Sequence, residues 1–322
     1  MDIVLKNQRK ESILQDILPY LAPDIYKLIA PHSLQLGSSL EEIRLRCNQP
    51  IVLRTTDQEL TITRQGKLDS KLAGGYRVKT EDLSRTIASI SDNSFYAFEE
   101  EIRRGFITIP GGHRVGLAGQ MVIRDNQVHN ISSFSSIAIR MARQIKGCAS
   151  SLLPQLVHKG RVNNTLVVSP PRCGKTTLLR DLTRILSSGD DHIPGCNITV
   201  VDERSEIAGC YHGIPQMDIG PRTDVLDACP KALGMMMAIR SLSPDILVTD
   251  ELGRKEDLYA VRECINAGVN IIASVHAGSI EEIQRRDILQ DLLSQGIFQS
   301  IVILSRRHGP GTVEEIIRWE EE

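Results

Sequence analysis

The sequence predicts an α/β fold for the second half of the chain, with a largely parallel sheet. After about Asn164, short apolar runs alternate with stretches of helical periodicity. Several of these runs are continuously apolar, which is typical of strands that are buried on both faces of a parallel sheet. The predicted strands are the apolar runs at 166–168, 198–201, 246–248, 271–275 and 301–304.

The composition is that of a soluble globular protein that is long enough for two domains. Hydrophobic residues make up 41% and charged residues 24% of the 322 residues. A net charge of −2 and 4% aromatic residues speak against a nucleic-acid partner or an acidic membrane surface. The chain contains no apolar signal core and no run that approaches 18 apolar residues, so we expect a cytoplasmic protein without a membrane-spanning helix. The seven cysteines include no C-x-x-C pair, which fits a reducing cytosol.

The pattern changes near Ser150, and we place a domain boundary there. Residues 1–150 are predicted to form an N-terminal α/β domain, and residues 151–322 form the second domain. In the first domain a helical pattern is followed by mixed strands and one further helix. The expected elements are helical structure over 11–33, a strand over 43–47, a helix over 80–90 and β structure over 105–123, interrupted at 110–112.

The stretch SPPRCGKTTLLRD, at 169–181, predicts a phosphate-binding loop. It follows a predicted strand and precedes an apolar-striped helix, as the G-x-x-x-x-G-K-[ST] motif requires. The helix N-terminus and loop amides favour a phosphate, Lys175 is expected to reach the β- and γ-phosphates, and Thr176 is expected to hold Mg²⁺. The residues expected to bind nucleotide are Ser169, Pro170, Pro171, Arg172, Cys173, Gly174, Lys175, Thr176 and Thr177.

The loop departs from the motif at its first position, where Ser169 replaces a glycine. If the backbone there is strained, serine costs about 1–3 kcal/mol. The two prolines that follow stiffen the loop and offset part of this cost. Cys173 is interpreted as an ordinary loop residue, with a redox role as the alternative.

The segment ILVTDELGR, at 246–254, ends an apolar strand in two carboxylates. It lies about 75 residues after Lys175, so it supplies the second half of a phosphoryl-transfer site. Asp250 is expected to orient Mg²⁺ through water. Glu251 is expected to polarise the attacking water.

Two more strands end in polar residues at the same predicted edge of the sheet. ITVVDERSEIAG carries Glu203 and Glu206, which are candidates for positioning Mg²⁺ or water, with structural salt bridges as the alternative. IIASVHAGS ends in His276, a candidate donor to the γ-phosphate region. A satisfied structural histidine is the alternative.

The order GKT, DERSE, DELGR, SVHAGS resembles the secretion ATPase superfamily of type II and type IV secretion and type IV pili. The resemblance implies a RecA-like P-loop ATPase domain with a smaller N-terminal α/β domain, working as a homo-hexamer with ATP and Mg²⁺. The catalytic glutamate of that superfamily falls on Glu251, its box histidine on His276, and its acidic box on Asp202, Glu203 and Glu206.

EEIRLRCNQP, YAFEEEIRRGFITIPGGHRVGLAGQ and the segment from 222 to 253 look like a narrower family, the sporulation stage III AA family of endospore-forming Firmicutes. This resemblance covers about residues 11–320. It implies a cytoplasmic ATPase on the mother-cell side that works with membrane-embedded proteins of a channel to the forespore.

Transition-state arginines are expected outside the phosphate loop. Arg114 and Arg140 match positions where secretion ATPases place arginines over the nucleotide, which would then lie between the two domains. Arg103 and Arg104 are alternatives, and simple surface ion pairs are the structural interpretation. Arg240 is the candidate for reaching a neighbouring subunit.

We therefore expect an ATP-hydrolysing motor or energiser of a secretion-type channel. The alternative is a nucleic-acid-dependent P-loop ATPase, against which the chain shows no basic stripe with interleaved aromatic residues. A nucleotide-binding scaffold without turnover has no need for Glu251.

Overall fold

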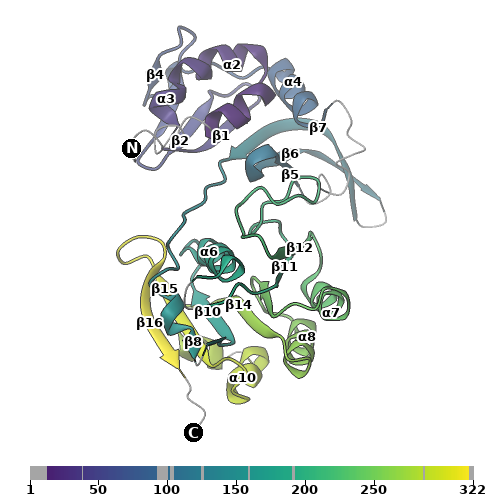
Figure 1. The fold of residues 1–322 in the computed structure, drawn as a ribbon. Coiled ribbons are helices and arrows are strands. Elements are labelled where there is room, and N and C mark those ends of the chain that lie inside the picture. Colours follow the sequence, from purple (N-terminus) through teal and green to yellow (C-terminus); the bar gives the residue numbers. More distant parts are fainter. Residues whose placement is uncertain are drawn as a thin grey trace. The chain divides into compact units, whose positions relative to one another are not determined.

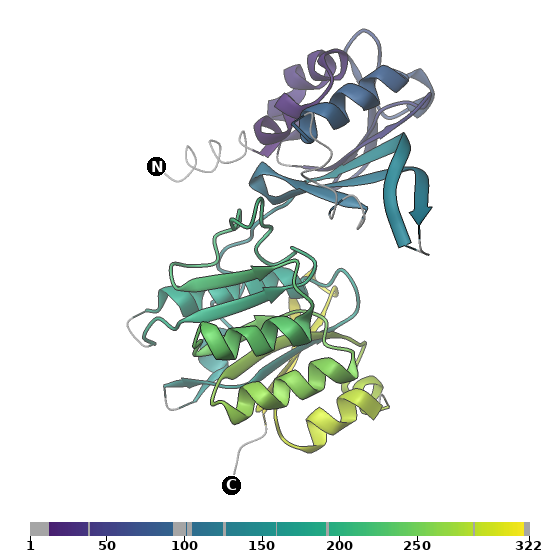
Figure 2. The same ribbon diagram turned by 90° about the vertical axis from the view of Figure 1, so that its right-hand side faces the viewer.

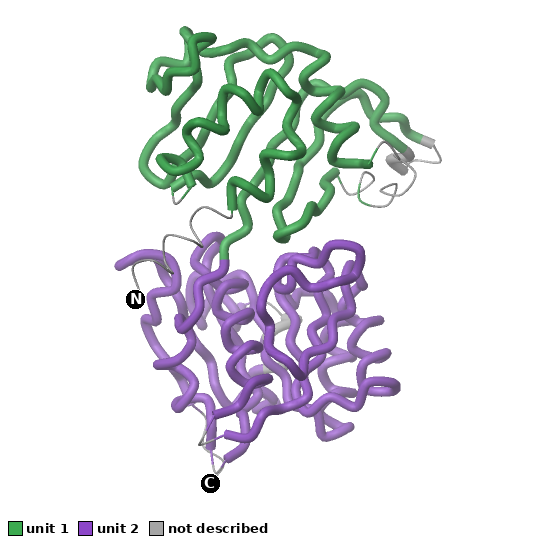
Figure 3. The backbone as a smooth tube through the Cα atoms, turned by 45° about the horizontal axis from the view of Figure 1, so that its top comes forward, with its two compact units in different colours: residues 1–143 green, residues 144–322 purple. Residues whose placement is uncertain are grey.

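The computed structural model describes residues 13–37, 39–92, 101, 105–124, 127–158, 160–190, 193–285 and 287–318. The chain divides into two compact units, residues 1–143 (unit 1) and 144–322 (unit 2) (Figure 3). The sequence had suggested a boundary near Ser150. Residues 144–150 belong to unit 2 because Gln144 donates to the carbonyl of Asp218, Lys146 forms an ion pair with Asp218, and the Ala149 amide donates to Asp181.

Unit 1 contains a seven-stranded sheet in the order β4-β3-β2-β1-β7-β6-β5 (Figure 1). Neighbouring strands in the described part of this sheet pair antiparallel. Ile43 and Leu45 are buried and alternate with more exposed charged residues, as the sequence predicted for a half-covered strand. The strands are β1 (Leu40–Arg46), β2 (Val52–Thr55), β3 (Glu59–Ile62), β4 (Leu68–Asp69), β5 (Phe106–Ile109), β6 (His113–Arg124) and β7 (Gln127–Arg140).

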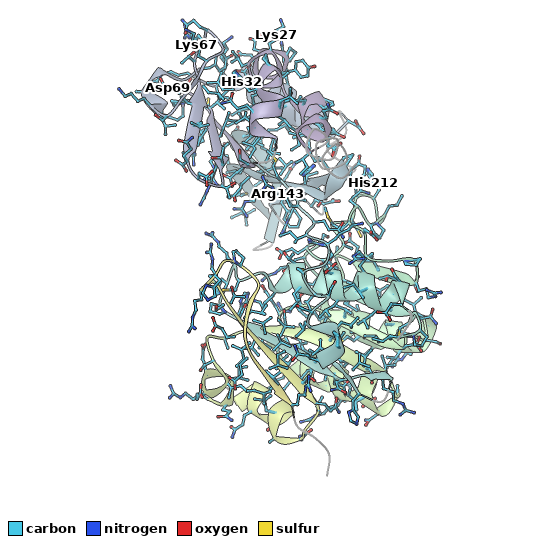
Figure 4. The ribbon with its side chains drawn as sticks, turned by 60° about the vertical axis from the view of Figure 1, so that its left-hand side comes forward. Lys27, His32, Lys67, Asp69, Arg143 and His212 are labelled. Atoms are coloured by element: carbon cyan, nitrogen blue, oxygen red, sulfur yellow. The ribbon has the colours of Figure 1, made fainter. Side chains whose placement is uncertain are left out.

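The predicted helical structure over 11–33 is confirmed in its described part, although prolines divide it into short helices. Residues 13–17 are helical, Pro19 and Pro23 lie at the starts of η1 (Leu18–Tyr20) and α2 (Pro23–Ile29), and η2 (Ala30–His32) and α3 (Ser33–Leu36) follow. The predicted helix over 80–90 is confirmed as α4 (Thr80–Ile90). His32 ties the helical segment to the β3–β4 hairpin, since its Nε2 lies 2.7 Å from the carbonyl oxygen of Gly66 (Figure 4).

Unit 2 contains a second seven-stranded sheet, in the order β12-β11-β13-β14-β10-β15-β16. Six strands are parallel, and β16 pairs antiparallel with β15. The five strands predicted from apolar runs are confirmed, whereas the two edge strands, β12 and β16, were missed. The strands are β10 (Thr165–Ser169), β11 (Ile198–Asp202), β12 (Thr223–Asp227), β13 (Ile246–Thr249), β14 (Asn270–His276), β15 (Ser300–Ser305) and β16 (Thr312–Arg318), besides the short pair β8 (Val157–His158) and β9 (Arg161–Val162).

Helices cover both faces of this sheet (Figures 1 and 2). Alternating residues of β10 pack into the two hydrophobic clusters on opposite faces of the sheet. Val167 belongs to the cluster of α6 (Lys175–Ser188), whereas Leu166 and Val168 belong to the cluster on the other face. That second face carries α7 (Lys231–Ser241), α8 (Lys255–Asn266), α9 (Ile280–Gln284) and α10 (Asp287–Ser294). The carboxyl ends of the parallel strands therefore meet at one edge, where α/β proteins bind ligands.

None of the helices in the described part of the chain has both the length and the apolar character needed to cross a bilayer.

Leu179→Ala tests the packing of α6 on the sheet. Leu179 has 0% of its surface exposed, so the substitution leaves a cavity and should lower the free energy of unfolding by about 2–5 kcal/mol, measured by urea denaturation. Leu233→Ala is the control: Leu233, on α7, is 56% exposed and should cost less than about 0.5 kcal/mol. Equal losses in the two variants would contradict the core assignment.

Candidate functional site

The candidate site is built on the loop between β10, which ends at Ser169, and α6, which begins at Lys175. The loop turns through two residues with left-handed backbone, Arg172 (φ 61°) and Gly174 (φ 88°). Gly174 is the N-cap residue of α6, and a glycine adopts this conformation without steric cost. The free amides of the first turn of α6 then lie at the carboxyl edge of the sheet, which is the geometry of an anion site.

Ser169 does not introduce the strain considered from the sequence. It is the last residue of β10, fully buried, and pairs with His276 of β14 in the parallel register. Its hydroxyl donates to the carbonyl of Pro170 at 2.8 Å. The turn that a leading glycine would ease is instead made later in the loop, at Arg172 and Gly174.

A second segment, the β15–β16 hairpin, supports the loop from outside. The amide of Gly311 donates to the carbonyl of Cys173 at 2.9 Å. A Cβ atom on Gly174 would lie only 3.0 Å from the Gly311 nitrogen, so the two backbones pack closely. Gly311 (φ 88°) and Gly309 (φ 112°) both need left-handed backbone to form this hairpin turn. This contact could not be predicted from the sequence, because no apolar run marks β16.

A chain of hydrogen bonds joins Lys175 to Glu251 through His276. The Lys175 ammonium lies 2.7 Å from His276 Nδ1, and His276 Nε2 lies 2.6 Å from Glu251 Oε1. Because an ammonium can only donate, Nδ1 accepts and Nε2–H donates to the carboxylate. Lys175 also lies within 3.3 Å of the Ser169 hydroxyl and of the carbonyls of Ser169 and Pro170. Burial lowers the pKa of Lys175, and the charge of Glu251 opposes this shift.

Asp250 is a buried carboxylate whose two oxygens have no hydrogen-bond partner among the described residues. Burial, helped by the charge of Asp202, raises the pKa of Asp250 to about 7. A buried carboxylate of this kind is stabilised by a cation that binds its oxygens. Thr176 lies in the first turn of α6 at the same edge. Mg²⁺ typically takes one or two protein ligands beside water and phosphate oxygens, so Thr176 and Asp250 fit the predicted site.

The acidic loop after β11 folds around the buried carboxylate of Asp202 and also carries Glu206. The buried carboxylate of Asp202 accepts the amides of Glu206, Ile207 and Ala208, at 2.8–2.9 Å. Burial nevertheless raises the pKa of Asp202 to about 6. Arg180 of α6 donates to the carbonyls of Glu206 and Ile207. The charge of Glu206 raises the pKa of both Lys175 and Asp250, and its role at the site stays a prediction.

Glu203 has the salt bridge that the sequence left as an alternative. Its carboxylate pairs with Lys231, a buried lysine at the start of α7. Lys231 also lowers the pKa of Asp250, so it partly balances the carboxylates at this edge. Sequence reasoning missed Lys231, because nothing near it in the chain marks it as part of an acidic site.

The five candidate arginines lie in different parts of the chain. Arg240 is exposed in the last turn of α7. Because α7 runs back from the carboxyl ends of the strands to their amino ends, Arg240 lies toward the edge opposite the loop. Arg103 and Arg104 lie outside the described residues.

Arg114 and Arg140 belong to unit 1, where they are register partners on β6 and β7. The Arg114 guanidinium lies 4.0 Å from the ring centre of Phe106. Arg140 is 3.3 Å from a Glu42 oxygen, an exposed ion pair. Their roles over a nucleotide stay predictions.

The arrangement in unit 2 is that of a RecA-like P-loop domain, and solved structures share the fold. The Legionella pneumophila ATPase DotB matches with a TM-score of 0.59 and 16% identity, over 88% of this chain and 76% of that one. The pilus retraction motor PilT with bound ADP matches with a TM-score of 0.55 and 15% identity, over 85% and 76%. At these identities the likeness concerns the fold.

The family follows from sequence comparison. The family model described as "Sporulation stage III, protein AA" matches residues 7–321. The chain is also 44% identical over 277 residues to "Stage III sporulation protein AA" of Bacillus subtilis (strain 168), which is 86% of each chain. This chain therefore belongs to the Sporulation stage III, protein AA family, as its motifs indicated.

The unpaired carboxylate of Asp250 should make the ligand-free protein less stable as pH rises. Its folded pKa of about 7 exceeds the ordinary aspartate pKa of 3.8, so the native state binds the extra proton between these values and loses that stabilisation as pH rises through 7. Asp250→Asn should raise the free energy of unfolding at pH 8 by more than about 1 kcal/mol and flatten its slope between pH 4 and 7. Denaturant titrations over this range measure both, and an unchanged slope would contradict the assignment.

The hairpin contact predicts unequal effects of two glycine substitutions. Gly311→Ala and Gly309→Ala place a methyl group in open space, and both strain a left-handed residue. Only Gly311 donates to the phosphate loop. We expect Gly311→Ala to weaken ADP binding about 10-fold, since strain at residue 311 displaces the amide that binds Cys173 and with it the loop, and Gly309→Ala to change it less than about 2-fold. Equilibrium titration with a fluorescent ADP analogue measures both affinities. Equal effects of the two substitutions on ADP affinity would exclude a role of the hairpin in the site.

Proposed function

We propose that this protein binds ATP with Mg²⁺, hydrolyses it to ADP and phosphate, and drives a secretion-type channel in the third stage of sporulation. The observation that carries the proposal is the hydrogen-bonded chain from Lys175 through His276 to Glu251. It connects Lys175, after β10, with the Glu251 carboxylate, after β13, and β14 lies between these two strands. All three strand ends lie at the edge of the sheet where the amides of the phosphate loop lie.

Nucleotide binding would begin with the exchange of partners at Lys175. In the structure its ammonium is held by protein oxygens and by His276, which are weaker partners than a triphosphate. The phosphates would take the loop amides and the ammonium group, and Thr176 and Asp250 would hold the ion. Bound Mg²⁺ supplies charge neutralisation between the β- and γ-phosphate oxygens.

Hydrolysis would use Glu251 as the water-orienting carboxylate. Glu251 has a left-handed backbone (φ 45°), and its backbone amide donates a hydrogen bond to the Ser274 hydroxyl oxygen at 3.1 Å. Strain of this kind costs about 1–3 kcal/mol and is maintained where surrounding structure fixes the residue. When Lys175 turns to the phosphates, His276 loses its Nδ1 partner while its Nε2 stays on Glu251. His276 would thereby report occupancy of the phosphate site to the acid.

The working form would be a homo-oligomer, with six subunits as the favoured number. Arg114 and Arg140 are proposed to supply positive charge to the phosphates in the transition state, and Arg240 is proposed to reach a neighbouring subunit. The resemblance to secretion ATPases supports membrane-embedded channel proteins as partners and a position at the cytoplasmic face on the mother-cell side.

Glu251→Gln tests the proposal, because it keeps the size of the side chain and removes the charge. Turnover of Mg-ATP should fall about 10²- to 10⁴-fold, as for the loss of a general base, while ATP still binds. Glu256→Gln, at an exposed position in the first turn of α8, is the matched control and should keep the parental rate. Phosphate release and ATP binding are measured with and without single-stranded DNA. Parental turnover in Glu251→Gln would refute the assignment, and strong stimulation by DNA would favour a nucleic-acid-dependent ATPase.

A further inference from the structure

Arg204 lies at the candidate site, although neither the motif analysis nor the proposed mechanism assigns it a role. Its guanidinium nitrogen Nη1 lies 2.8 Å from Oε2 of Glu251. The other carboxylate oxygen, Oε1, accepts from His276. Each oxygen of Glu251 is therefore held by a different strand end, one following β11 and one ending β14.

Three sets of hydrogen bonds hold the turn that carries Arg204. Behind it, the Asp202 carboxylate accepts three successive amides, beginning with that of Glu206. Within it, Ser205 has left-handed backbone (φ 53°) and donates its hydroxyl to Asp227 at 2.6 Å. Beneath it, Arg180 binds two carbonyls of the same loop. Because the backbone of this turn is held in place, a side chain that it carries can fix the position of a neighbouring group.

The ion pair is exposed enough to have little part in folding. The Arg204 side chain is 55% exposed, against 21% for Glu251. Ion pairs at this exposure contribute little to stability. The carboxylate of Glu251, by contrast, must be oriented toward a water molecule, and small deviations in this orientation reduce reaction rates strongly. The contact thus matters more for orientation than for stability.

We propose that Arg204 is a positioning residue for the reaction, acting through Glu251, whose carboxylate it orients by holding Oε2 while His276 holds Oε1. This inference rests on the proposed function, in which Glu251 orients the attacking water. It concerns a residue inside DERSE that the sequence analysis passed over while naming the acids on either side.

Three variants test the role. Arg204→Ala should lower kcat of Mg-ATP hydrolysis about 10- to 100-fold and change KM less than about 3-fold, because the carboxylate loses its orientation but the phosphate loop is intact. Arg204→Lys keeps the charge and should recover part of kcat. Arg262→Ala is the matched control: Arg262, on α8, is 41% exposed and 3.9 Å from Asp291, and its loss should leave kcat unchanged.

A double-mutant cycle separates action through Glu251 from other roles. In the Glu251→Gln background, Arg204→Ala should change the residual single-turnover rate less than about 2-fold, because the charged carboxylate that Arg204 positions is gone. A parental or raised kcat in Arg204→Ala, or a full additional loss in the double variant, would overturn the inference. Parental turnover in Glu251→Gln alone would refute the proposed function instead, so the two failures are distinguishable.

Discussion

The contact between the Lys175 ammonium and His276 Nδ1 is the interaction on which the rest of the site depends. It forms because β10 and β14 are neighbours in the parallel sheet, with Ser169 and His276 in register. A buried ammonium requires hydrogen-bond acceptors, and in the described structure it takes the carbonyls of the strand end and the imidazole ring. The same requirement fixes the histidine tautomer and so directs a donor at Glu251. Charge at the phosphate loop and orientation of the acid are therefore linked through one imidazole ring.

Much of the fold could be predicted because central parallel strands consist of continuous runs of apolar residues. β10, β11, β13, β14 and β15 all follow such runs. β12 and β16 could not be found in this way, since edge strands keep one side in solvent: β16 reads TVEEIIR and carries exposed carboxylates. The first helical region is divided into short helices for a local reason, because its apolar spacing continues across prolines that lie at the starts of new helical segments.

The site was predictable where its residues lie at strand ends, and unpredictable where they act through distant partners. Lys175, Asp250, Glu251 and His276 follow from the rule that parallel strands bring their carboxyl ends together. The pairs Glu203–Lys231 and Glu251–Arg204 join residues that are far apart in sequence, and no periodicity marks them. Asp202 looked like a functional acid, yet it serves as the internal cap of its own loop, since burial and three amides occupy it.

The β15–β16 hairpin also bears on how the site comes into being during synthesis. β10 and the phosphate loop leave the ribosome long before β15, its neighbour in the sheet, and before Gly311, which binds the carbonyl of Cys173. Until residues 300–311 are made, one edge of β10 has no strand beside it and the loop lacks its outer support. Long-range contacts of this kind form late, because closing the intervening chain costs entropy first. A nascent chain would thus complete its sheet and its phosphate loop in the same late step, so a truncated product would have neither.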